Sequence, residues 1–514
     1  DNGLFSKDYN DITNMTWSNI LTYQTKIKKK HNLDLLAGYE INSKESDGLG
    51  TTISNFARWD KPEVNNGVVY QSMGGSNSTT RIVSYITRAN YDYDNKYYLG
   101  ASWRTDGSSR LARENRWGNF WSLSGAWRVS SESFMKPLQN WLSDLKLRVS
   151  YGVNGTLPSS YYGYMGLSSL TSNYNDNPGI TQSQLENKEL TWETNYNFNS
   201  GIDLGFFDNR LNVTFEYYVR TTKNLLYSRP LSLATGFSSY LANIGKLQNK
   251  GYELEIRSTN IETKDFRWST SLNLGHNANK ILKLDGDLKQ VTSGTSIHKV
   301  GLPYSTYYMI EFAGIDPVDG EPMFYKNTTD ENGNLNKETT KDPRSAEKVI
   351  LQCADPTITG GLGNSISYKW FDLNFNVNFS FGAWNYDGAA GKLEHGGDGT
   401  LNIPIYYRKR WQKEGDETSI ERFVVGRSIS MTDYATTRRL YSGDYVRLKN
   451  LTFGFTLPKT WTRKVGIDNI RLYASGNNLL TWAAYDYIDP ESGSSPSWDT
   501  PPMRTYTFGL EVKF

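Results

Sequence analysis

The sequence is poor in the residues that most often carry enzymatic or metal chemistry. Its 514 residues include one cysteine, Cys353, and four histidines. One cysteine excludes an internal disulfide and a cysteine-based metal site. The histidines do not form the i, i+4 pair of a zinc protease, and nucleophile-elbow and phosphate-loop motifs are missing. We therefore expect no catalytic residue, no metal site and no cofactor, and a protein that is not an enzyme.

The sequence also lacks a strong charge bias and a long apolar run. The formal net charge is +2, so nucleic acid is not an expected partner. No apolar run approaches the roughly 18 residues of a membrane-spanning helix, whereas barrel strands need only about 10 alternating residues. Aromatic residues make up 14% of the chain. This richness is typical of membrane barrels with aromatic girdles and also of secreted β proteins with tyrosine-rich loops, such as glycan-binding proteins.

Alternation with a period of two is the dominant pattern. In the last segment one face carries only large apolar residues, which are Tyr506, Phe508, Leu510, Val512 and Phe514. The run from Phe371 to Phe381 alternates Phe, Leu and Val with Asp, Asn and Ser. Strand side chains point to opposite faces in turn, so each segment has one apolar and one polar surface. This pattern predicts an all-β, antiparallel, transmembrane β-barrel in contact with the lipid bilayer.

We expect 15 strands. They cover residues 12–25, 32–42, 79–92, 96–105, 119–130, 144–153, 190–204, 210–221, 249–259, 265–276, 357–369, 371–382, 443–457, 468–481 and 503–514. A change of parity predicts a bulge near Lys449–Asn450. Short connections alternate with long ones, which we expect on the outer side at 43–78, 106–118, 154–189, 222–248, 277–356, 383–442 and 482–502. Because single-chain barrels normally have an even strand number, residues 1–514 are expected to be the C-terminal portion of one barrel domain.

Several stretches resemble the SusC/RagA family of TonB-dependent outer-membrane transporters of Bacteroidota. The most specific is the run from Tyr441 to Pro458, YSGDYVRLKNLTFGFTLP. It is followed by IRLYASGNNLL from Ile470, YIDPE from Tyr487 and the closing PPMRTYTFGLEVKF from Pro501. Upstream, NIGKLQNKGYELEI from Asn243 is also similar to a family signature.

The resemblance implies a 22-stranded barrel of which this chain supplies about 15 strands, with the plug and TonB box absent from it. It implies nutrient uptake across the outer membrane, with oligosaccharides as cargo. Oligopeptide import or a passive porin-like barrel are the alternatives. The partners it implies are a SusD-like surface lipoprotein, TonB acting through a part outside this chain, and the N-terminal plug and barrel segment of the same transporter.

Aromatic residues in two long connections are the candidate cargo-binding residues. They are Tyr161, Tyr162, Tyr164, Trp384 and Tyr386. Flat aromatic faces stack on sugar rings, although these side chains equally suit loop packing or the outer girdle. The apolar face that ends at Phe514 resembles the signal read by the barrel-assembly machinery, and it also suits the inner aromatic girdle.

Overall fold

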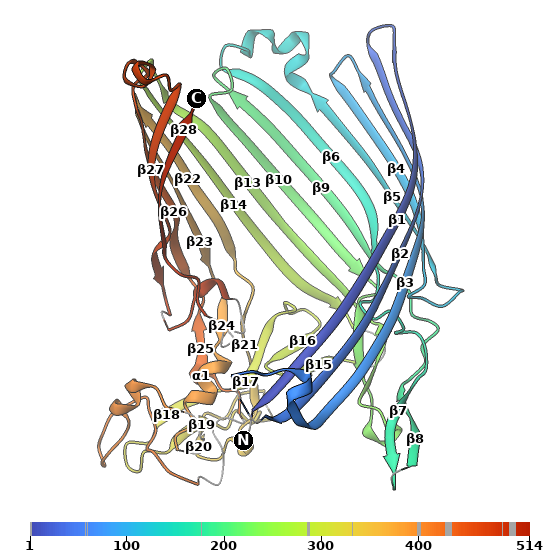
Figure 1. Ribbon diagram of the computed structural model, residues 1–514, viewed down its shortest axis with the longest axis vertical. Helices are drawn as coiled ribbons and strands as arrows, with labels where there is room; N and C mark the ends of the chain where they lie inside the picture. Colours follow the sequence, from blue (N-terminus) through green and yellow to red (C-terminus); the bar gives the residue numbers. More distant parts are fainter. Residues whose placement is uncertain are drawn as a thin grey trace. The chain divides into compact units, whose positions relative to one another are not determined.

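Fifteen long strands form one sheet in which each strand pairs with its neighbours in the chain order (Figure 1). Wherever the register is described, the pairing is antiparallel. The strands are β1 (Leu4–Ile27), β2 (His31–Phe56), β3 (Gly67–Tyr93), β4 (Tyr97–Ser108), β5 (Trp117–Arg128), β6 (Leu142–Thr156), β9 (Glu193–Phe206), β10 (Leu211–Lys223), β13 (Lys246–Glu262), β14 (Phe266–Lys283), β22 (Ile358–Tyr368), β23 (Phe371–Phe381), β26 (Tyr445–Thr456), β27 (Asn469–Ala483) and β28 (Thr505–Lys513).

This computed structural model describes residues 3–514 except 57, 59, 176, 285–287, 332, 398–401, 427–433, 486 and 493–499. The chain divides into two compact units, which are described separately below. The first comprises residues 1–132, 146–200 and 219–247, and the second 133–145, 201–218 and 248–514. Within the described ranges, no helix has the length and apolar character needed to cross a membrane.

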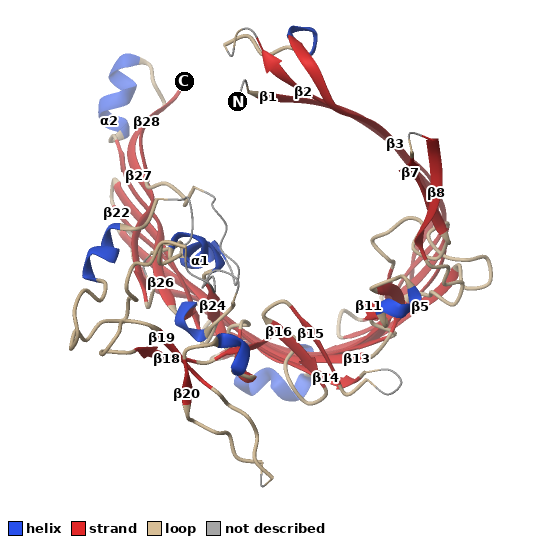
Figure 2. Ribbon diagram, turned by 90° about the horizontal axis from the view of Figure 1, so that it is seen from below, coloured by secondary structure: helices blue, strands red, loops and turns tan. Residues whose placement is uncertain are grey.

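Shorter elements lie in the connections, where Figure 2 shows strands in red and helices in blue. The strands are β7 (Leu167–Tyr174), β8 (Asn177–Gln184), β11 (Leu226–Pro230), β12 (Ser239–Asn243), β15 (Gln290–Ser293), β16 (Ser296–Lys299), β17 (Thr306–Ile310), β18 (Phe312–Ile315), β19 (Pro322–Tyr325), β20 (Thr339–Thr340), β21 (Lys348–Cys353), β24 (Trp384–Tyr386) and β25 (Leu440–Ser442). The α-helices are α1 (Gly388–Leu393) and α2 (Lys459–Thr462). The 3-10 helices are η1 (Val64–Asn66), η2 (Val129–Ser131), η3 (Ser133–Leu138), η4 (Leu233–Thr235), η5 (Pro343–Ser345), η6 (Ile405–Lys409), η7 (Thr437–Arg439), η8 (Arg463–Val465) and η9 (Pro490–Ser492).

Strand β23 shows how alternation separates the two faces of the sheet in the second unit. The Phe371 ring stacks on Phe455 of β26, with the ring centroids 4.9 Å apart. On the opposite face, the carboxylate of Asp372 accepts a hydrogen bond from Arg471 at 2.7 Å. The register between β23 and β26 shifts so that Lys449 has no partner residue. The predicted bulge at Lys449–Asn450 is therefore confirmed.

Two rows of aromatic rings cross the strands of the first unit. One row joins Trp17, Tyr39, Tyr85 and Trp117, with successive ring centroids 5.1 to 6.2 Å apart. The other joins His31, Tyr93, Tyr97 and Trp127, with successive centroids 5.0 to 6.4 Å apart. At about 3.3 Å per residue, the rows lie about 26 Å apart along β3. For strands tilted by about 40°, as in membrane barrels, this is about 20 Å along the membrane normal, somewhat less than the roughly 25 Å apolar band between aromatic girdles.

The predicted loop at 43–78 is wrong over most of its length. Residues 43–56 continue β2 and residues 67–78 belong to β3, and the two strands pair with each other beyond the first aromatic row. β1 pairs with β2 as far as Leu4 opposite Ser54. The sequence here is rich in Gly, Ser, Asn and Asp, which read as turn residues. Ile53 and Phe56 are buried at the far end of this ribbon. Between them and the aromatic row, small and polar residues occupy both faces, so the backbone pairing left no alternation in the sequence.

The two faces of β23 should respond very differently to an added charge. We expect Phe375→Arg to lower the free energy of unfolding by about 2–4 kcal/mol, because the apolar face would carry the guanidinium into the lipid. Asn376→Arg, on the polar face, should lower it by less than about 1 kcal/mol. Urea titration of the transporter refolded in lipid vesicles measures both. Equal losses would show that the two faces are assigned wrongly.

Candidate functional site

The predicted tyrosines 161, 162 and 164 fasten their connection to the first unit. The Tyr162 hydroxyl accepts a hydrogen bond from the backbone N–H of Thr79 at 2.9 Å. The Arg110 guanidinium lies 4.4 Å from the centroid of the Tyr161 ring. Tyr164 packs against a buried apolar cluster. All three rings are partly buried, so packing accounts for their contacts, and their binding of cargo stays a prediction.

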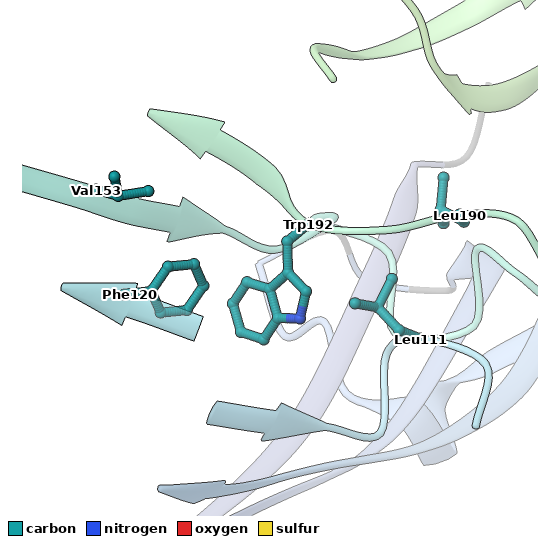
Figure 3. Close-up of a cluster of buried hydrophobic side chains, with 5 residues drawn as sticks. All are labelled: Leu111, Phe120, Val153, Leu190 and Trp192. Atoms are coloured by element: carbon teal, nitrogen blue, oxygen red, sulfur yellow. The ribbon is translucent and has the colours of Figure 1, made fainter. Parts of the chain in front are cut away.

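That cluster is built from two strand ends and the connections beside them (Figure 3). Phe120 of β5 and Val153 of β6 meet Trp192, and Leu111 and Leu190 complete the set. The Phe120 and Trp192 rings meet edge to face, with centroids 5.2 Å apart. The indole N–H of Trp192 donates to the backbone carbonyl of Arg116 at 3.0 Å. The cluster gives the 157–192 connection a fixed base.

The predicted Trp384 and Tyr386 form β24 in the second unit. Both pack against a small core whose buried members are Tyr307, Met309 and Leu440. Burial raises the pKa of the Tyr386 hydroxyl. Their role in binding cargo likewise stays a prediction. The residues that directly follow Tyr386 line a cavity.

The cavity has a volume of about 960 Å³ and is bordered by residues from α1, η6, β27 and the segments around η9. Three tyrosines form one wall, and we call this space the tyrosine cavity. The centroids of Tyr485 and Tyr487 are 5.3 Å apart, and those of Tyr487 and Tyr406 are 5.7 Å apart. Tyr485 also stacks on Tyr441, at 3.7 Å and an interplanar angle of 9°. Prolines 404, 490, 501 and 502 add further flat apolar surface.

The tyrosines differ in how firmly they are held. The Tyr485 hydroxyl donates to Oδ2 of Asp387 at 3.1 Å. Burial, followed by the neighbouring Tyr441 and Asp387, raises the pKa of Tyr485. Tyr485 therefore stays a neutral donor at physiological pH. Tyr487 is 68% exposed, so its ring is available to a ligand.

A buried arginine fixes one side of the cavity. Arg447 of β26 is 2% exposed and donates to Asp489 at 2.6 Å and to Glu491 at 2.7 Å. Lys449 also donates to Glu491, at 2.6 Å. These charge-assisted bonds tie the segment after β27 to β26. We call this group the Arg447 clamp.

A second group of charges lies behind Tyr406. Glu421, fully buried, accepts hydrogen bonds from Arg438 and from the Tyr407 hydroxyl. Tyr406 donates to Glu394 at 2.5 Å, and Arg439 donates to the same carboxylate at 3.2 Å. Burial lowers the pKa of Arg438, but the attraction of Glu421, Tyr407 and Glu394 outweighs it and the pKa is raised. No group of three or more His, Cys, Asp and Glu side chains in the described ranges is placed to hold a metal ion.

Comparison with known proteins identifies the family. A family model described as "TonB dependent receptor-like, beta-barrel" matches residues 1–479. The chain belongs to this family. It is 33% identical to TonB-dependent receptor P3 of Formosa agariphila, with 99% of this chain and 53% of the relative aligned. It is 30% identical to TonB-dependent receptor SusC of Bacteroides thetaiotaomicron, with 84% of this chain and 44% of the relative aligned.

A solved structure supports the same assignment. The RagAB peptide transporter matches with a TM-score of 0.87 and 28% identity, over 99% of this chain and 56% of that chain. These matches confirm the predicted resemblance to the SusC/RagA family, the β-barrel fold and the outer-membrane location. Members of this family are receptors and transporters rather than enzymes. The chain spans about half the length of the curated relatives it matches.

The sequence alone did not predict the tyrosine cavity. Arg447 belongs to the motif that starts at Tyr441, while Tyr487, Asp489 and Glu491 belong to the YIDPE motif. Both motifs were visible in the sequence, but nothing in it showed that the arginine of one binds the carboxylates of the other. The arginine of the first motif and the carboxylates of the second carry opposite charges, and this is the signal from which their ion pairs could have been predicted.

The apolar residues predicted for the last segment lie on or just after β28, in which both faces are largely exposed. Tyr506, Phe508 and Leu510 are 68%, 83% and 63% exposed in β28, and Phe514 follows directly after the strand. Val512 pairs with Ile470 of β27. Recognition of this face by the assembly machinery stays a prediction.

Proposed function

We propose that this chain supplies barrel strands and a cargo-contacting surface to an outer-membrane, TonB-dependent importer of oligosaccharides. A SusD-like surface lipoprotein works with it, and a plug and the TonB contact lie in other parts of the same transporter. Family membership and the likeness to SusC and RagAB support the importer class. The observation that favours oligosaccharides is the tyrosine cavity, whose aromatic wall stands beside carboxylates and an arginine.

The arrangement suits a sugar for a physical reason. A sugar ring offers an apolar face of C–H groups and a rim of hydroxyls. Tyr487 presents an open aromatic face to the C–H groups of the ring. Polar side chains of the cavity wall offer hydrogen bonds to its hydroxyls. Oligopeptide import is the second candidate, favoured by the structural match to the RagAB peptide transporter.

Uptake measurements distinguish the importer from a passive porin-like barrel. Labelled oligosaccharide should accumulate in cells that carry the full-length transporter and its lipoprotein. Deleting TonB, or collapsing the proton gradient with an uncoupler, should abolish accumulation. A porin would continue to admit the sugar in both cases. Mass spectrometry of cargo that copurifies with the complex then separates sugar from peptide.

Tyr487→Ala tests the aromatic wall. We expect oligosaccharide affinity of the purified transporter to fall about tenfold, because loss of one stacking face costs roughly 0.5–1.5 kcal/mol beyond the area it covers. Isothermal titration calorimetry measures the change. Tyr174→Ala is the matched control, since Tyr174 is 84% exposed in the β7–β8 hairpin and does not line the cavity. Equal losses of oligosaccharide affinity in both variants would show that the cavity is not part of the binding site.

A further inference from the structure

Two polar groups that line the tyrosine cavity have no partner among the residues that the structure describes. Arg504 makes no hydrogen bond or ion pair with any described residue. The side-chain oxygen of Asn478 is buried and accepts no hydrogen bond. A buried acceptor without a donor is uncommon in a native protein and calls for a partner. Among the described residues, the Arg504 guanidinium and the Asn478 side-chain oxygen are thus left to bind a ligand in the cavity.

The other charged groups that line the cavity already have hydrogen-bond or ion-pair partners. Arg447 and Lys449 face Asp489 and Glu491 within the Arg447 clamp. The two carboxylate oxygens of Asp387 accept from the Tyr485 hydroxyl and from the N–H of Ala390. Among the described lining residues, Arg504 is therefore the cation that makes no ion pair, while Asp387 is the lining carboxylate held by neutral donors.

The positions of Asn478 and Arg504 are fixed by the edge of the sheet. The Asn478 amide nitrogen donates to the backbone carbonyl of Met503 at 3.3 Å. One residue earlier in β27, Asn477 pairs with Thr505 and donates to its hydroxyl at 3.1 Å. Asn478 has a left-handed backbone, with φ of 53°, where asparagine is better tolerated than most residues. Because its nitrogen is occupied, the oxygen is the group left for a ligand.

We propose that the tyrosine cavity selects an acidic oligosaccharide, one that carries a carboxylate or sulfate on a sugar ring. Arg504 donates hydrogen bonds to the anionic group, Asn478 accepts from a neighbouring hydroxyl, and Tyr487 stacks on the ring. Arginine suits such a group because its planar guanidinium binds carboxylate or sulfate oxygens in pairs. This inference rests on the proposed function and makes Arg504 a specificity-determining residue of the same site.

Binding to the purified full-length transporter with its lipoprotein tests the inference. The probes are galacturonic-acid oligomers, galactose oligomers of equal length and an acidic peptide of similar mass. We expect the acidic sugar to bind about tenfold more tightly than the neutral sugar at low salt, as a charge-assisted hydrogen bond allows. The difference should shrink in high salt, because screening weakens an exposed charge pair.

Substitutions of Arg504 test whether this residue selects the acidic sugar. Arg504→Gln should remove the preference for the acidic sugar while neutral-sugar affinity stays within about twofold, and Arg504→Lys should keep part of the preference. Arg463→Gln, at an exposed arginine outside the cavity, is the control. If Arg504→Gln does not fold, Arg504→Lys and the salt dependence of the native protein decide.

The outcomes separate this inference from the function on which it rests. Equal affinity for the two sugars, or a preference that survives Arg504→Gln, overturns the role of Arg504 and leaves oligosaccharide import standing. Binding of the acidic peptide with no binding of either sugar overturns both. Loss of the preference in Arg504→Gln alone, with the control unchanged, supports the proposal.

Discussion

Replacing Arg447 by methionine should lower the free energy of unfolding of the full-length transporter by about 3–5 kcal/mol. The substitution keeps much of the side-chain length but removes the charge between Asp489 and Glu491, which are 12% and 23% exposed. Of the described ion pairs in the clamp, the one between Lys449 and Glu491 would then remain, and Asp489 would keep none. Removing one partner of a buried ion pair is costly because the remaining charge has lost both water and its counter-charge. Urea titration of the protein in lipid vesicles measures the loss.

The same variant should release the segment after β27. Limited proteolysis is expected to cut near η9 in Arg447→Met and not in the native protein, because the clamp is what ties this segment to β26. Oligosaccharide affinity should fall as well, since Tyr487 lies on the released segment. Arg463→Met, at an exposed site, should change none of these. If Arg447→Met unfolds like the native protein, the clamp does not stabilise the cavity.

A triple variant separates lost attraction from lost packing. Arg447→Met combined with Asp489→Asn and Glu491→Gln removes three of the four charges of the clamp and leaves that of Lys449. We expect it to recover more than half of the stability lost in Arg447→Met, because neutral amides no longer repel each other. No recovery would mean that the loss comes from the packing of the arginine side chain rather than from charge.

The structure also shows which features the sequence could predict. Strands such as β23 and β28 border lipid on one face, so apolar and polar residues must alternate, and that pattern is local in the sequence. The bulge at Lys449 was predictable for the same reason, because it shifts the parity. The ribbon formed by the far ends of β2 and β3 carries small and polar residues on both faces over much of its length. Its backbone pairing imposes no alternation, so composition pointed to a loop.

The candidate site was harder to predict because it depends on contacts between distant segments. Arg447 and Glu491 lie 44 residues apart in the sequence and meet through the pairing of β26 with β27. Tyr485 and Tyr441 stack across a similar separation in the sequence. Aromatic residues were correctly expected in the long connections, but the sequence did not show which rings pack and which stay open. That distinction depends on burial, as the contrast between Tyr162 and Tyr487 shows.

The largest loss of stability outside the clamp is expected from Glu421→Leu. Glu421 is fully buried and faces Arg438, which is 12% exposed. In Glu421→Leu the ion-pair partner that the guanidinium keeps among the described residues is Glu394, at 3.8 Å. The Tyr407 hydroxyl loses its acceptor. We expect the free energy of unfolding to fall by about 3–5 kcal/mol. Tyr407→Phe, which removes one hydrogen bond, should cost about 1 kcal/mol.

The double variant Glu421→Leu/Arg438→Leu decides why the single variant is costly. Buried ion pairs are often replaced by apolar residues at little net cost, because neither charge is then stranded. We therefore expect the double variant to be more stable than Glu421→Leu alone, by at least about 2 kcal/mol. Urea titrations of the native protein, both single variants and the double variant give the coupling energy between the two residues. Additive losses would show that Glu421 and Arg438 act independently, and that the charges behind Tyr406 do not hold the cavity wall as a unit.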